Sequence, residues 1–240
     1  MKAHENSIRG KIKSIMTSPF VIIEVFIISS FLMYWLGGPG FLFGLFISLI
    51  TLWAIKWDWS YFGLGDIKWL SSIVPALGFT LIIILLNDII LEPWLTILTQ
   101  TPIDLEAFEG LRDNIPNLLI MLAISWTVAA FGEEFFYRGY IMNRLAHIMG
   151  NNKKAWILAT FLSSFVFGIV HAYQGTSGMI STGFVGLILA CAFYMNKNNL
   201  WVGILTHGIY DTYGLTMIYL GNDQIIKNIM IEIYQTLINK

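Results

Sequence analysis

Two adjacent glutamates, Glu133 and Glu134, lie within one of the most apolar stretches of this chain, and Arg138 follows four residues after the second. A carboxylate placed in hydrocarbon costs about 3 kcal/mol or more, so acids are rare in membrane-spanning segments and usually functional. The pair therefore indicates a functional site, and acid–base chemistry is what carboxylates most often perform there.

Three further polar residues interrupt other apolar runs: His171, His207 and Asp211. His207 and Asp211 are four residues apart, so they share one face of a helix. Groups of this kind are left without hydrogen bonds when they face lipid, and they therefore face a helix-bundle interior or a water-filled cavity. We expect three separate helices to bring the glutamates, His171 and His207 together.

Helical geometry separates the two glutamates. Glu134 and Arg138 are stacked on one face, where they can form an ion pair. Glu133 is rotated by about 100° from Glu134, and no cation follows it at a spacing of three or four. This spacing predicts a structural role for Glu134 and leaves Glu133 free to act as a general base.

The composition is that of a membrane protein. Of 240 residues, 56% are hydrophobic and 12% are charged, about half of the ~25% charge of a soluble domain. The net charge of −1 provides no basic surface for nucleic acid. The single cysteine, Cys191, cannot form an internal disulfide and is expected to be a buried apolar residue.

Seven apolar runs are candidate transmembrane helices, because a span needs about 20 mostly apolar residues. They are residues 20–36, 41–55, 69–91, 118–145, 155–171, 179–195 and 200–220. Residues 225–238 carry Lys227 and Glu232 and form either an eighth span or a helix on the membrane surface. The predicted fold is an all-α polytopic bundle of seven or eight transmembrane helices.

The predicted organisation is one membrane bundle in three parts. Residues 1–115 supply N-terminal helices and an acidic loop, 116–215 the catalytic core, and 216–240 the tail or eighth helix. We predict a single helix through the glutamates, without a break at Gly132, because this places Glu133 near mid-depth. His171 then lies roughly 10 Å from the middle of its own span, and helix tilt can close that difference.

Basic residues predict the orientation. Lys2, Arg9, Lys11 and Lys13 precede the first apolar run, which predicts a cytoplasmic N-terminus and an uncleaved anchor. Alternation then places these residues inside: Lys56, Lys68, Arg144, Lys153, Lys154 and Lys197. The acidic loop placed outside carries Asp104, Glu106, Glu109 and Asp113.

Three segments resemble, in order, the motifs of one family. They are Glu-Glu-Phe-Phe-Tyr-Arg at 133–138, Phe-Gly-Ile-Val-His at 167–171 and His-Gly-Ile-Tyr-Asp at 207–211. The corresponding motifs, E-E-x-x-x-R, F-x-x-x-H and H-x-x-x-N/D, are those of the CAAX proteases and bacteriocin-processing enzymes, which include the type II CAAX prenyl endopeptidases. The resemblance covers roughly residues 118–214 and implies an intramembrane endopeptidase with an eight-helix core.

The resemblance also implies roles for individual residues. Glu133 is similar to the glutamate that activates the attacking water, and His171 to its partner. His207 and Asp211 resemble the groups that stabilise the tetrahedral oxyanion. The supporting residues of the first motif are Glu134 and Arg138.

Metal participation stays open at this point. Glu133, His171 and His207 match the donor set of a catalytic zinc site with water in its open position. However, the chain has no H-E-x-x-H motif, and three separate helices give no local ligand spacing to test. A divalent metal such as zinc and a metal-free mechanism of glutamate and histidine are both compatible with the resemblance.

Three functional classes remain open. The first is an intramembrane protease acting on membrane-associated, prenylated or bacteriocin-like peptides, with a peptide or membrane protein as substrate and the lipid bilayer as surroundings. The second is a proton- or ion-coupled transporter, because buried acids and histidines also line ion pathways. The third is a non-catalytic scaffold or immunity protein of the same fold. The sequence makes no prediction of oligomeric state.

Overall fold

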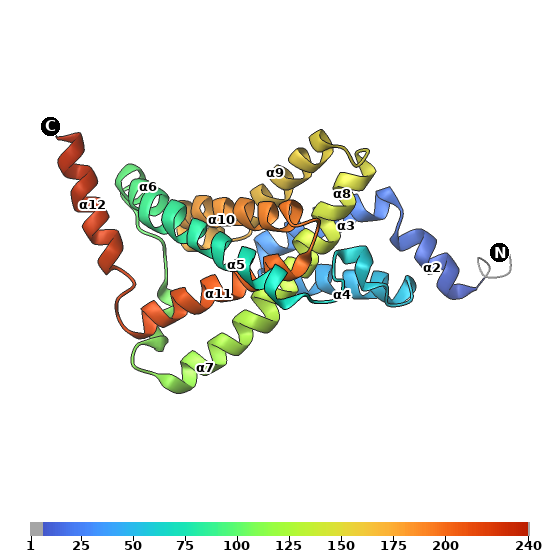
Figure 1. The fold of residues 1–240 in the computed structure, drawn as a ribbon, viewed down its shortest axis with the longest axis horizontal. Helices are drawn as coiled ribbons and strands as arrows, with labels where there is room; N and C mark the ends of the chain where they lie inside the picture. Colours follow the sequence, from blue (N-terminus) through green and yellow to red (C-terminus); the bar gives the residue numbers. More distant parts are fainter. Residues whose placement is uncertain (1–6, 240) are drawn as a thin grey trace.

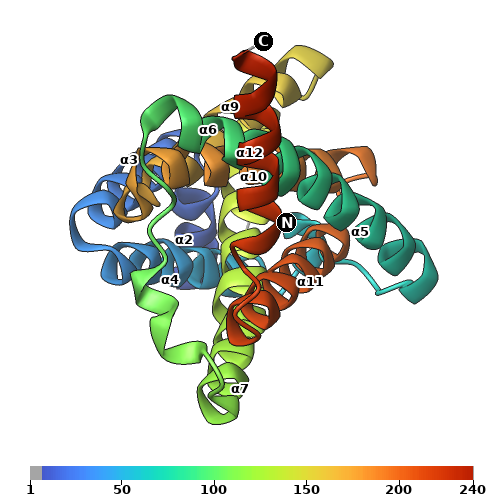
Figure 2. The ribbon, with the colours of Figure 1, turned by 90° about the vertical axis from the view of Figure 1, so that its left-hand side faces the viewer.

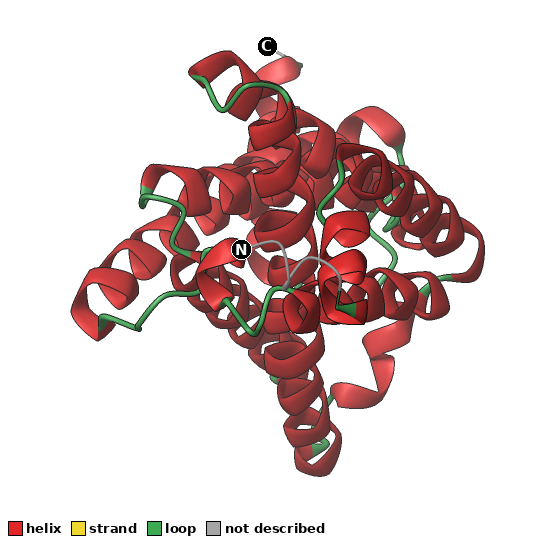
Figure 3. Cartoon of the chain, turned by 90° about the vertical axis from the view of Figure 1, so that its right-hand side faces the viewer, coloured by secondary structure: helices red, strands yellow, loops and turns green. Residues whose placement is uncertain are grey.

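The computed structural model describes residues 7–239, which form helices joined by loops and contain no strand (Figures 1 and 3). The predicted all-α class is therefore confirmed for this part of the chain. Lys2, one of the residues on which the predicted orientation rests, lies outside the described residues.

The N-terminal helices are α2 (Ile8–Met16), α3 (Pro19–Leu36), α4 (Gly38–Ala54) and the short 3-10 helix η1 (Trp59–Phe62). A continuous helical segment follows, made of α5 (Trp69–Ile83), the π-helix η2 (Ile84–Leu91) and α6 (Glu92–Thr99). The 3-10 helix η3 (Glu106–Leu111) lies in the next loop. The remaining helices are α7 (Ile115–Ile124), the π-helix η4 (Ser125–Met142), α8 (Asn143–Ile148), α9 (Lys153–Ile169), the 3-10 helix η5 (Ala172–Gln174), α10 (Gly175–Met195), α11 (Leu200–Tyr219) and α12 (Ile225–Ile238).

Four helices of the described chain are long and apolar enough to cross a membrane. They are Pro19–Leu36, Trp69–Thr99, Ile115–Ile148 and Ala172–Met195, and Gly38–Ala54 is a shorter apolar helix. The predicted count of seven or eight spans is therefore not confirmed. α9 has only 17 residues, and α11 carries His207 and Asp211, which lower its mean hydropathy.

The helix that carries the glutamates is unbroken, as predicted. It runs over 34 residues from Ile115 to Ile148, and its central part, η4, has the wider π-helical hydrogen bonding. π-Helical turns are rare and frequently occur at functional sites. Gly132 permits a close contact here rather than a break, since a Cβ at this position would lie 3.1 Å from the Phe41 ring.

A cluster of buried aromatic rings fixes η4 in the bundle. Phe62 stacks on Phe135 with ring centroids 4.5 Å apart. Tyr137 meets Phe167 edge-on, with ring centroids 5.0 Å apart. All four of these side chains are buried. Helices within a bilayer are held together by close van der Waals packing rather than by removal of apolar surface from water, and these ring contacts hold the helix that bears the glutamates from two sides.

α9 and α10 are packed closely enough to exclude side chains between them. A Cβ on Gly168 would lie 2.6 Å from the Met179 carbonyl oxygen and 2.9 Å from the Gly183 Cα. With 17 residues, α9 is about 25 Å long, shorter than the ~30 Å hydrocarbon core. The chain therefore turns back early, and the turn carries His171.

The C-terminal helix α12 lies against α6 (Figures 1 and 2). Trp94 and Tyr234 stack at 5.2 Å, and Lys227 Nζ lies 2.8 Å from Glu92 Oε2. With 14 residues, α12 is about 21 Å long, which is too short to cross the bilayer alone.

Candidate active site

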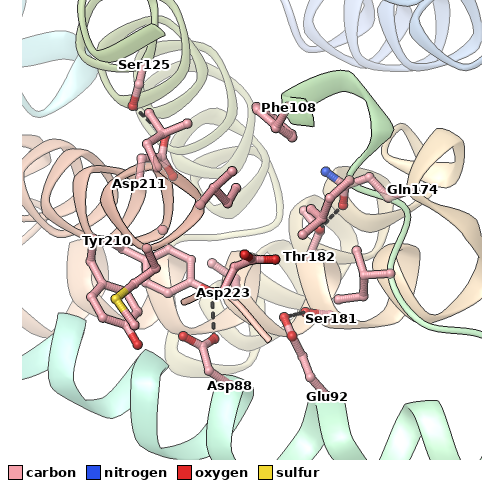
Figure 4. Close-up of a pocket in the computed structure, with 18 of the residues that line it drawn as sticks. Asp88, Glu92, Phe108, Ser125, Gln174, Ser181, Thr182, Tyr210, Asp211 and Asp223 are labelled. Atoms are coloured by element: carbon pink, nitrogen blue, oxygen red, sulfur yellow. Dashed lines mark hydrogen bonds between the residues drawn. The ribbon is translucent and has the colours of Figure 1, made fainter. Parts of the chain in front are cut away.

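One cavity of about 390 Å³ contains every residue predicted to be catalytic. Glu133, His171, His207 and Asp211 all line it, and they come from η4, the turn after α9, and α11. This volume is within the range of ordinary ligand pockets. Figure 4 shows Asp211 and Ser125 on one side of the cavity, and Asp88, Glu92 and Ser181 on another.

Glu134 and Arg138 are fully buried and form the predicted ion pair behind the cavity. Arg138 Nη1 lies 2.7 Å from Glu134 Oε1, and Arg138 Nη2 donates a 3.0 Å hydrogen bond to the carbonyl oxygen of Gly186. The guanidinium also lies 4.4 Å from the centroid of the Phe167 ring. The prediction of a structural role for Glu134 agrees with this geometry, since it holds η4, α10 and the end of α9 together.

Glu133 has the opposite surroundings. Its side chain lines the cavity, and it makes no hydrogen bond or ion pair with any residue in 7–239. The turn of the helix between positions 133 and 134 produces this difference, as the sequence predicts. Of the two adjacent carboxylates, only Glu133 is available to a molecule in the cavity.

His171 is oriented by the helix that precedes it. Its Nδ1 lies 2.6 Å from the Phe167 carbonyl oxygen. A carbonyl oxygen only accepts hydrogen bonds, so Nδ1 carries a proton, and in the neutral ring Nε2 is an acceptor. Because His171 lines the cavity, this geometry provides a second acceptor in the cavity that the Glu133 carboxylate lines.

His207 lies between two carboxylates. Its Nδ1 is 3.1 Å from Glu134 Oε1, whereas its Nε2 is 3.6 Å from Asp211 Oδ1. The second distance is too long for a hydrogen bond. The nearer partner of His207 is therefore Glu134 and not Asp211, its neighbour on the same helical face.

Ser125 is a residue of the site that the sequence motifs do not contain. Its hydroxyl lies 2.7 Å from Asp211 Oδ2, and its side chain is buried at the start of η4. The hydroxyl therefore fixes the Asp211 carboxylate on the cavity wall. The only sequence signal was its position in the same apolar run as the glutamates, eight residues before Glu133.

A second polar cluster at the cavity was also missed. Tyr210 donates a 2.7 Å hydrogen bond to Asp88 Oδ1, and Ser181 donates a 3.1 Å hydrogen bond to Glu92 Oε1, which belongs to the carboxylate paired with Lys227. Asp88, Glu92 and Lys227 lie outside the predicted core of 116–215. The available signal was the pair of acids at the end of an apolar run.

The donor set proposed for a metal does not fit. Within residues 7–239 no three His, Cys, Asp or Glu side chains are grouped so as to hold an ion. Glu133, His171 and His207 share the cavity without converging as ligands, so no step below passes through a metal.

Gly203 makes the position of Glu134 possible, which gives a prediction about stability. A Cβ at Gly203 would lie 2.9 Å from Glu134 Oε2, so we expect Gly203→Ala to lower the free energy of unfolding by about 1–3 kcal/mol. Thermal unfolding of the purified protein in detergent measures this.

Gly214→Ala is the matched control for that experiment. It lies on the same helix, and a Cβ there meets nothing within 4 Å. This variant should be neutral or gain up to about 1 kcal/mol, because alanine favours helix. Equal melting temperatures for the two variants would contradict the close packing of Glu134 on α11.

Comparison with known proteins gives one match. Residues 115–213 match the family described as type II CAAX prenyl endopeptidase Rce1-like. No curated protein and no solved structure matches the chain. The match begins where α7 begins and extends past Asp211, so it contains all three motifs and confirms the predicted family resemblance.

Proposed function

We propose that this protein, whose residues 115–213 carry the Rce1-like type II CAAX prenyl endopeptidase pattern, is an intramembrane endopeptidase in which Glu133 activates water. The observation that carries the proposal is the unequal environment of the two glutamates. Glu134 is neutralised by Arg138 and His207, while Glu133 faces the cavity without a partner in the described chain. A base must be free to take a proton, and Glu133 meets that condition.

In the proposed reaction, one water molecule donates its hydrogen bonds to the Glu133 carboxylate and to Nε2 of His171. As the water oxygen attacks the carbonyl carbon of the peptide bond, Glu133 takes a proton from it. The tetrahedral intermediate then collapses, the carbon–nitrogen bond breaks, and Glu133 returns the proton to the leaving nitrogen. The products are a carboxyl group and an amine, so atoms and charge balance.

His207 is the proposed donor to the oxyanion. Its Nδ1 is held by Glu134, and its Nε2 is not within hydrogen-bond distance of Asp211, so the protonated ring has one N–H to direct into the cavity. The Asp211 carboxylate, which accepts a hydrogen bond from Ser125, lies 3.6 Å from that Nε2 and favours the positive charge of the protonated ring. A donor of this kind contributes about 10²–10³-fold to the rate of acyl transfer.

The role of His171 is tested by a matched pair of histidines. Both His171 and His147 bring Nδ1 close to the carbonyl oxygen four residues earlier, at 2.6 and 2.7 Å, but only His171 lines the cavity. With a fluorogenic peptide library and purified protein in detergent, we expect His171→Ala to reduce cleavage by about 10²-fold or more. His147→Ala should keep most of the activity. Equal activities would remove His171 from the mechanism.

A transporter is the second candidate, and the cluster of Asp88, Glu92, Lys227 and Tyr210 is the observation that favours it. Linked acids and hydroxyls in a membrane cavity also form proton pathways. Reconstituted vesicles with a pH gradient separate the two classes. Proton flux that is abolished by Asp88→Asn, with no peptide cleavage by the parent protein, would favour transport over hydrolysis.

A further inference from the structure

We infer that the cavity opens on the side of the membrane opposite to the cytoplasm, so that its substrate is a peptide segment presented outside the cytoplasm. That the molecule entering the cavity is a substrate rests on the proposed endopeptidase function. The side on which the cavity opens, however, follows from the arrangement of charges and loops alone.

Basic residues gather at one end of the bundle, which we call the basic end. Its loops and helix ends are tied together: Leu200 N donates a 2.9 Å hydrogen bond to Gly63 O, Asn143 Nδ2 donates a 3.2 Å hydrogen bond to Tyr61 O, and Arg144 lies 3.8 Å from the Tyr61 ring. The basic residues of these segments and of the adjoining α2 are Arg9, Lys11, Lys13, Lys56, Lys68, Arg144, Lys153, Lys154 and Lys197.

The opposite end is acidic, and we call it the acidic end. The loop of residues 100–114 is bound there to two other turns, through a 3.1 Å hydrogen bond from Asp104 N to Gln174 O and one of 3.2 Å from Asp113 N to Tyr219 O. In Figure 1 this loop lies with α6 and α12 toward the end marked C, whereas α2, α4 and α8 lie toward the end marked N. The loop carries the acids Asp104, Glu106, Glu109 and Asp113 and one cation, Arg112, which forms an ion pair with Asp223.

The cavity opens between segments of the acidic end. Its wall includes Leu105, Phe108, Gln174 and Asn222, and Tyr173 on the same wall is 64% exposed. No cavity-lining residue comes from the segments 55–68, 143–154 or 196–199 of the basic end. Water and peptide therefore reach Glu133 from the acidic end.

Membrane proteins retain Lys and Arg of short loops in the cytoplasm. Applied to the basic end, this rule places the acidic end and the cavity opening on the other face. The expected substrate is thus an exported chain, or the outward-facing segment of a membrane-anchored one. A protein confined to the cytoplasm cannot reach the opening.

Cysteine labelling in intact cells tests this without any assay of cleavage. In a full-length protein with Cys191→Ala, single cysteines replace Glu106 at the acidic end, Tyr173 at the cavity opening and Lys154 at the basic end. All three positions are exposed. A membrane-impermeant maleimide is added before and after permeabilisation, and labelling is read by a shift in gel mobility.

We expect Glu106→Cys and Tyr173→Cys to be labelled in intact cells, and Lys154→Cys only after permeabilisation. The reverse pattern, or labelling of all three in intact cells, would overturn the inference. Failure here leaves the proposed function untouched, because a cavity open to the cytoplasm still hydrolyses peptides in detergent. Failure of the function leaves the labelling pattern untouched, because labelling does not require activity.

Discussion

Glu133→Gln should abolish peptide cleavage and leave the amount of folded protein unchanged. The amide cannot take the proton of the attacking water, and general-base catalysis contributes about 10²–10⁴-fold. The substitution preserves the size of the side chain and removes no hydrogen bond or ion pair, because Glu133 makes none within residues 7–239. Cleavage of a peptide library and elution on gel filtration measure the two effects separately.

Exogenous nucleophiles sharpen that experiment. Hydroxylamine attacks without deprotonation by the enzyme, so it should restore part of the activity of a Glu133→Gln variant, although not the part that depends on the proton returned by Glu133 to the leaving nitrogen. A Glu133→Gln variant that cleaves at the rate of the parent protein would show that Glu133 is not the base. The cavity would then need another acid, and Asp88 and Asp211 also line it.

Glu134→Ala should have the opposite effect to Glu133→Gln: it should reduce the amount of folded protein. Removing the carboxylate leaves Arg138 charged and fully buried without its partner, and breaking a buried ion pair by deleting one side costs about 3–5 kcal/mol. His207 loses its nearer partner at the same time. We therefore expect a low yield and a markedly lower melting temperature in detergent.

Glu232→Ala is the control for Glu134→Ala. Glu232 is an exposed glutamate on α12, and exposed charges contribute little to stability. A Glu134→Ala variant as stable as Glu232→Ala, but inactive, would mean that Glu134 takes part in the reaction directly. The division of labour between the two glutamates would then be wrong.

The sequence predicted the contacts that depend on helical period. The spacing of Glu134 and Arg138 predicts an ion pair on one face, and the pair has the expected geometry. The same period left Glu133 on another face, where it lines the cavity. Convergence of Glu133, His171 and His207 followed from the cost of exposing polar groups to lipid.

Contacts between distant segments could not be predicted in this way. Ser125 reaches Asp211 across 86 residues, and Tyr210 reaches Asp88 across 122 residues. Such pairings depend on how the helices are arranged in space, and the periodicity of a single sequence does not indicate that arrangement. The same limit explains His207, whose i+4 neighbour Asp211 is the more distant of its two carboxylates.

The π-helical segments could not be predicted from the sequence either. η2 carries Asp88, and η4 carries Glu133, so two of the acids that line the cavity occur where the helical hydrogen bonding is widened. Nothing in the residue types of these segments distinguishes them from ordinary apolar helix.

The short length of α9 gives the surrounding lipid a means of controlling the site. A helix about 25 Å long matches a thin bilayer and is mismatched with a thick one, and mismatch is relieved by tilt or by local thinning. Either response moves the turn that carries His171 relative to η4. In the proposed endopeptidase, the alignment of His171 with Glu133 would therefore depend on acyl-chain length, and the membrane in which the protein resides would become part of its specificity.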